Sequence, residues 1–136
     1  MEILKAMQLA SAGMRVQGTR MRVVAENLAN ADTAPENANG EPYRRKMVTF
    51  KNVLDRSTGV YRLRVDRIIT DRTEFERKYD PGHPAADDRG YVTMPNVKTM
   101  IELMDMKQAQ RSFEANLSVI QAAKTMLQKT IDLLRA

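Results

Sequence analysis

Apolar side chains recur at alternating steps of four and three residues along the N-terminal part of the chain. The positions, apolar at all but one, are Ile3, Met7, Ala10, Met14, Gln17, Met21, Val24 and Leu28. This spacing is the a/d pattern of a coiled coil, and it fits slightly better than the broader stripe of a plain amphipathic helix. The pattern predicts a coiled-coil helix over residues 1–30.

A second seam with the same spacing fills the C-terminal part of the chain. Its positions, two of them polar, are Leu103, Met106, Gln110, Phe113, Leu117, Ile120, Lys124, Leu127, Ile131 and Leu134. No Gly or Pro follows Pro95, so we expect one helix over residues 96–136, about 60 Å long, with Asn96 as its N-cap. The polar residues in both seams either fix register and partner choice or mark imperfect seams.

The middle of the chain, residues 31–95, consists of short alternating runs between turn formers. Residues 31–42 hold no large apolar side chain and indicate a loop, and residues 55–59 and 79–84 are rich in turn formers. Strand-like alternation occurs at 47–50 and more clearly at 61–69. The whole pattern predicts a mainly α fold with a small β-rich insert, in which the terminal helices pair as an antiparallel coiled coil in an elongated subunit.

Composition agrees with a thin molecule rather than one with a deep core. The chain has 136 residues, 5% aromatic side chains, no Trp and no Cys, so disulfides and thiolate metal sites are excluded. No apolar run approaches the length of a membrane span, and the N-terminus lacks the features of a cleaved secretory signal. We therefore expect no membrane insertion and, if the chain leaves the cytoplasm, another export route.

Charge and candidate chemistry give little support for nucleic-acid binding or catalysis. The net charge of +5 is spread thinly, and the densest basic run, residues 44–46, lacks interleaved aromatic residues or a recognition helix. The single histidine, His83, lies near Asp80, Asp87 and Asp88 at irregular spacing, a weak indication of a metal or acid-base site. We expect no enzyme activity, no cofactor and no nucleic-acid partner.

One helix pair with a single seam on each helix is marginally stable by itself. Apolar residues outside the seams widen the surface available to neighbouring chains: Met100, Ile101, Val119, Met126 and Leu133. The prediction is that the termini are mobile in the monomer and become ordered on assembly.

Four stretches of the chain resemble one known family. "YDPGHPAADDRGYVTMPNV", residues 79–97, closely resembles a motif of the proximal rod proteins of bacterial flagella, and it contains Asp80, Pro81, Gly82, His83, Pro84, Gly90, Tyr91, Met94, Pro95 and Asn96. "ENLANADT", residues 26–33, is similar to the Asn-Leu-Ala-Asn motif of flagellar rod and hook proteins in general, here Asn27, Leu28, Ala29 and Asn30. "GEPYRRKMVTF" at 40–50 and "RSFEAN" at 111–116 also resemble the rod family, with Phe113 in place of its tyrosine.

The resemblance implies a structural subunit of the basal-body rod, the hollow drive shaft that transmits torque across the periplasm. It implies that the terminal helices 1–30 and 96–136 form one axial core layer, that the insert faces outward, and that the flagellar type III apparatus exports the chain unfolded. The implied neighbours are FliE, FlgB, FlgF, FlgG and copies of the chain itself. The residues expected at subunit interfaces are Ile3, Met7, Met14, Met21, Val24, Leu28, Leu103, Met106, Phe113, Leu117, Ile120, Leu127 and Ile131.

A second function class remains open from the residues alone. Long helices of this kind are also typical of a soluble coiled-coil adaptor or export chaperone that clamps a partner helix. Within the rod interpretation, residues 80–97 are expected to form a rigid arm that aims the long C-terminal helix, because prolines restrict the chain and Gly82 and Gly90 permit turns.

Overall fold

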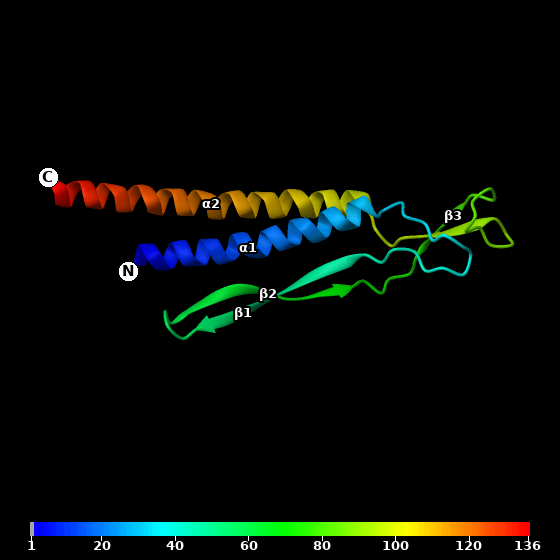
Figure 1. Cartoon of the computed structure of the whole chain (residues 1–136), viewed down its shortest axis with the longest axis horizontal. Coiled ribbons are helices and arrows are strands. Elements are labelled where there is room, and N and C mark those ends of the chain that lie inside the picture. Colours follow the sequence, from blue (N-terminus) through cyan, green and yellow to red (C-terminus); the bar gives the residue numbers. More distant parts are fainter. Residues whose placement is uncertain (1) are drawn as a thin grey trace.

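The computed structural model describes residues 2–136 and shows an elongated molecule with one long helix from each end of the chain. Helix α1 spans Glu2–Ala29 and helix α2 spans Thr99–Arg135, and the two lie side by side and antiparallel along the long axis (Figure 1). The β strands between them form a small insert. The predicted fold class is confirmed; Met1, the first residue of the predicted helix, lies outside the described residues.

Small side chains bring the two helices close together. Three alanines in the contact are at most 4% exposed: Ala10, Ala109 and Ala123. A Cβ atom added to Gly13 would lie 2.7 Å from Asn116 Nδ2. Asn27 lies fourteen residues after Gly13 on α1. It donates a hydrogen bond to Glu102, which lies fourteen residues before Asn116 on α2. In this register Glu2 is opposite Leu127, so residues 128–135 project beyond the start of α1.

The side of α2 that faces α1 differs from the predicted seam at every second position. Four predicted positions are half-buried: Met106, Phe113, Ile120 and Leu127. The intervening contacts come one residue earlier than predicted, from Glu102, Ala109, Asn116 and Ala123. The close approach favours small or hydrogen-bonded side chains there, and it leaves Leu103, Leu117 and Ile131 between 37% and 49% exposed.

Strands β1 (Lys46–Asp55) and β2 (Val60–Thr70) form an antiparallel hairpin that lies along α1 on the side away from α2 (Figure 1). Val16 and Val23 of α1 are each 2% exposed beneath it. Gly59, with φ of 68°, closes the turn by donating its amide to Asp55 O at 2.8 Å. The predicted alternation and the predicted turn at 55–59 are confirmed, and α1 is covered on two sides.

Strands β3 (Glu76–Tyr79) and β4 (Tyr91–Met94) form a second antiparallel pair at the far end of the molecule. The Tyr79 and Tyr91 rings meet edge to face at 5.3 Å. Gly90 has φ of 81°, and a Cβ atom there would come within 3.0 Å of the Tyr79 ring, so glycine is required. Strand β3 was not predicted, because its four residues are exposed and mostly charged.

Candidate functional site

Asn27, near the end of α1, holds the start of the β1–β2 hairpin against both helices. Its amide group donates to Lys46 O at 2.8 Å and to Glu102 Oε2 at 3.0 Å. Its Oδ1 accepts from Lys46 N at 2.9 Å and from the Tyr43 hydroxyl at 2.8 Å. Asn27 is 1% exposed and uses both donors and both lone pairs, so only a carboxamide side chain carries the groups that all four partners need.

Glu102, in the first turns of α2, is fully buried and binds the guanidinium of Arg45. Arg45 also reaches Asp71 Oδ2 at 3.4 Å and Asp105 Oδ2 at 3.5 Å. Arg20 of α1 forms an ion pair with Asp105 at 3.2 Å. One ionic network therefore joins α1, α2 and the segments that flank the hairpin, and we call it, together with Asn27 and Asn96, the junction.

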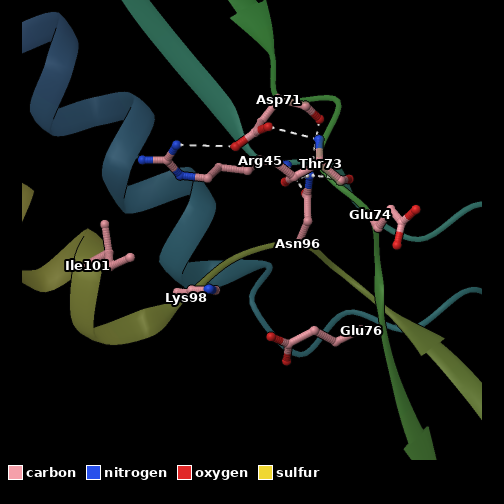
Figure 2. A pocket seen from close by; sticks show the side chains of 8 residues that line it. All are labelled: Arg45, Asp71, Thr73, Glu74, Glu76, Asn96, Lys98 and Ile101. Atoms are coloured by element: carbon pink, nitrogen blue, oxygen red, sulfur yellow. Dashed lines mark hydrogen bonds and ion pairs between the residues drawn. The ribbon is translucent and has the colours of Figure 1, made fainter.

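Asn96 completes the junction, and the prediction that it caps α2 is wrong. Helix α2 begins after Lys98, which supplies no side-chain cap. Asn96 Oδ1 instead accepts from Arg45 N at 2.8 Å, and its amide donates to Asp71 O at 3.0 Å and Thr73 O at 3.2 Å (Figure 2). The side chain therefore binds the backbone segments that flank the hairpin and not the start of the helix.

The charges of the junction support one another. Burial opposes the charge of Arg45, but hydrogen bonds and attraction from Glu102 and Asp71 outweigh it, so the pKa of Arg45 lies above its ordinary value. A hydrogen bond from the Thr73 backbone amide, aided by Arg45, lowers the pKa of Asp71. Burial raises the pKa of Tyr43. All three groups keep the protonation state that their hydrogen bonds require near neutral pH.

A hollow of about 310 Å³ opens beside the junction (Figure 2). It is lined by Arg45, Asp71, Thr73, Glu74, Glu76, Asn96, Lys98 and Ile101. The polar groups of Arg45, Asp71 and Asn96 on its wall are engaged with one another, as the dashed contacts in Figure 2 show. The arrangement is suited to fixing the position of the insert relative to the helices.

Near His83, the carboxylate of Asp87 holds the connection between β3 and β4. His83 Nδ1 accepts from Ala85 N at 3.0 Å. Asp87 Oδ1 accepts from the amides of Arg89 and Tyr91, each at 2.9 Å. Within residues 2–136 no group of three His, Cys, Asp or Glu side chains has a geometry that could hold a metal ion.

The residues of the resembling motifs separate into three places. Asn27 and Asn96 meet in the junction, and Leu28 and Ala29 complete α1. Asn30 donates to Glu26 O at 2.8 Å at the end of that helix. The remaining motif residues lie in the β3–β4 connection, in β4 and just after it: Asp80, Pro81, Gly82, His83, Pro84, Gly90, Tyr91, Met94 and Pro95.

Sequence reasoning missed Arg45, Asp71 and Glu102 as site residues. Within the basic run 44–46, nothing in the sequence distinguishes Arg45 as the partner of Glu102 and Asp71. Glu102 precedes the predicted seam position Leu103, and its complete burial, which only the structure reveals, is what requires a charged partner.

Comparisons with known proteins agree with this architecture. Residues 88–133 match the family model described as flagellar basal body rod FlgEFG protein C-terminal. The chain is 48% identical over 131 residues to the flagellar basal-body rod protein FlgC of Agrobacterium fabrum, covering 96% of this chain and 94% of the relative. It is 36% identical to FlgC of Escherichia coli O6:H1, covering 98% of both chains, and 33% identical to FlgC of Bacillus subtilis, covering 98% and 99%. The chain belongs to the FlgC family of flagellar basal-body rod proteins.

Membership in the FlgC family supports the structural interpretation and not the adaptor or chaperone alternative. The chain is a structural rod subunit of the flagellar basal body, a role that involves contacts with copies of itself and other rod components. The family-model match begins in the β3–β4 connection and includes β4, Asn96 and most of α2. Across residues 2–136, none of the helices combines the length and the apolar character that crossing a membrane demands.

Proposed function

We propose that this chain is a subunit of the proximal rod that assembles helically through α1 and α2 into the shaft that transmits torque across the periplasm. The main support for this proposal is the large surface area that the single chain exposes. The molecule exposes 9792 Å². A compact monomer of 15.5 kDa exposes about 7,200 Å², so roughly 2,600 Å² is in excess. Such an excess suits a subunit that neighbours surround, since obligate interfaces bury about 2,000–5,000 Å² in total.

The chemistry of the exposed surface supports the same proposal. The buried apolar residues are small: Ala10, Val16, Val23, Val24, Ala85, Val92, Ala109 and Ala123. Large apolar side chains lie at the surface of α2 instead: Met100, Ile101, Leu103, Met104, Leu117, Val119, Met126, Ile131, Leu133 and Leu134. Large apolar side chains exposed in this number along one helix favour contact with other proteins. Among the predicted seam positions, Leu103, Leu117 and Ile131 are therefore those available to neighbouring subunits.

The proposed partners are copies of the chain and the rod proteins FliE, FlgB, FlgF and FlgG. Export through the flagellar type III apparatus, without a cleaved signal peptide, agrees with a core of small side chains, because such a core opposes unfolding only weakly. The termini would then gain order as subunits assemble. The polar groups of the junction are engaged in structural hydrogen bonds, which supports a role without catalysis.

The projecting end of α2 provides the test. Leu133 and Leu134 are 79% and 83% exposed and lie beyond the start of α1. Replacing both with Asp should leave helicity and unfolding of the purified protein unchanged, because neither side chain packs within the subunit. The same variant should fail to restore rod assembly and motility to a strain that lacks the protein, since each buried leucine contributes about 1.5–3 kcal/mol.

Lys129→Asp is the matched control, because it adds an acid to an exposed position of the same projecting segment. It should restore rods and swimming. Normal rods in the Leu133→Asp/Leu134→Asp strain would refute assembly through this end of the helix.

A further inference from the structure

Charge is distributed unevenly between the two ends of the insert. Residues 46–70, the β1–β2 hairpin, contain six basic and two acidic side chains. Residues 31–42, the loop after α1, contain three acidic side chains and no basic one. The thin overall charge of the chain therefore conceals two local regions of opposite sign.

These two regions lie far apart in the molecule. Figure 1 shows the turn of the β1–β2 hairpin toward the end that carries both termini, and the loop after α1 at the opposite end, beside β3. The subunit therefore has a basic region toward one end of its long axis and an acidic one at the other.

Three arginines of this hairpin and one of α1 lie around two hollows, and we call them the basic tip: Arg15, Arg56, Arg62 and Arg64. Two hollows of about 300 and 250 Å³ adjoin there and share Arg62 and Arg64 in their walls. Arg62 is paired with Asp55 at 2.6 Å, whereas the other three arginines form no ion pair within residues 2–136. Arginine is enriched at the centres of protein interfaces.

The acidic region, which we call the acidic loop, consists of Asp32, Glu36 and Glu41. All three are exposed, and none takes part in an ion pair within the described part of the chain. The loop has a fixed shape, because Gly40 donates to Asn37 O at 3.0 Å and a Cβ atom on Gly40 would lie 2.9 Å from Pro35 Cβ. Such a loop presents its carboxylates without a large cost in ordering.

We propose that copies of this chain contact each other head to tail, with the basic tip of one copy bound to the acidic loop of the next. The proposal rests on the rod function proposed above and adds the surface that sets the axial spacing of subunits. Identical subunits that bind through two different surfaces form a ring only if the rotation from one subunit to the next divides a full turn evenly. Otherwise further subunits add along a helix. Arginine and carboxylate groups supply paired, directional hydrogen bonds that fix the register of such a contact.

A charge exchange between purified proteins tests the contact. The tip-reversed variant is Arg56→Glu/Arg64→Glu, and the loop-reversed variant is Glu36→Lys/Glu41→Lys. Sedimentation velocity over a concentration series should show self-association of the wild-type chain that weakens as salt rises. Each variant alone should associate about tenfold more weakly, because like charges then face each other.

The equimolar mixture of the two variants is the decisive sample. In it, each acidic surface can meet a basic surface on the other variant, so association should return to about the wild-type level. A chain with all four substitutions should also recover, whereas Lys129→Glu, on exposed α2, should behave as wild type. A mixture no better than either variant alone, or a wild-type chain that stays monomeric at low salt, overturns the contact. If that happens while Leu133→Asp/Leu134→Asp still blocks rod formation, the head-to-tail contact fails and the proposed function stands.

Discussion

Removal of the negative charge of Glu102 tests how strongly the junction holds the insert to the helices. Glu102→Gln keeps the size of the side chain but offers one acceptor and one donor group where two acceptors are needed. Arg45 Nε and Asn27 Nδ2 both donate to Glu102 and cannot both be satisfied by an amide. Glu102 is 0% exposed, so solvent does not replace the lost partner.

The expected loss of unfolding free energy is about 3 kcal/mol. Breaking a buried ion pair by removing one partner costs about 3–5 kcal/mol. The lower end applies here, because Arg45 keeps Asp71 at 3.4 Å and Asp105 at 3.5 Å and retains some access to solvent. A small domain has a total stability of about 5–15 kcal/mol, so the change would be easily measured.

A double-mutant cycle separates the pair from the packing around it. Arg45→Met should also destabilise, because it leaves Glu102 charged and buried. The single variants of the cycle are Arg45→Met and Glu102→Leu. The double variant should lose less unfolding free energy than the two single variants together, by about 1–3 kcal/mol, because both charges are then gone.

Urea unfolding followed by far-ultraviolet circular dichroism is the suitable assay, since the chain has no Trp for fluorescence. Glu114→Gln, an exposed position on the same helix, is the control and should change stability by no more than about 0.5 kcal/mol. Additive losses of unfolding free energy for Arg45→Met and Glu102→Leu would refute the network as described. A Glu102→Gln variant as stable as the control would do the same.

Two further predictions concern the same region. Asn96→Ala should lower the unfolding free energy in urea by about 2–3 kcal/mol, because several buried groups lose their partner. It should also speed hydrogen exchange of the Arg45 amide. A loss near 1 kcal/mol with unchanged exchange would instead indicate a helix cap. The pKa of Asp71 is lowered, so its stabilisation is present above its unfolded pKa of about 4 and is lost as pH falls through the lower folded value. Asp71→Asn should therefore lose stability relative to wild type at neutral pH, with the gap closing in acid; a gap independent of pH would contradict the ionic role.

The two helices were predictable because a long periodic pattern without Gly or Pro has few alternative structures. The side by which α2 contacts α1 was not. Leu103 is more apolar than Glu102, so a prediction from hydrophobicity assigns Leu103 to the contact with α1, although Glu102 makes that contact. The actual choice depends on how closely the helices approach, which Gly13 and the alanines determine, and on charged partners that are distant in sequence.

The junction is likewise invisible to local patterns. Asn27 meets Glu102 across 75 positions of the chain, and Arg45 meets it across 57. The resembling motifs identified Asn27 and Asn96, but they did not indicate that both bind residues 43–46, where β1 begins. Strand β3 was missed for a related reason, because its pairing with β4 comes from backbone hydrogen bonds and not from an apolar face.

The junction and the thin core have complementary physical roles. A buried ionic network contributes little net stability compared with apolar packing, but it tolerates few alternative arrangements of the groups that form it. The orientation of the insert is therefore fixed within one subunit, while most large apolar side chains of α2 stay at the surface. In such a subunit the junction sets how the insert is placed on the helices, and the exposed apolar side chains of α2 remain available for contact with other chains. For a structural rod subunit this division is useful, because the orientation of the insert is set within the chain and the surface of α2 is left for contacts with other rod components.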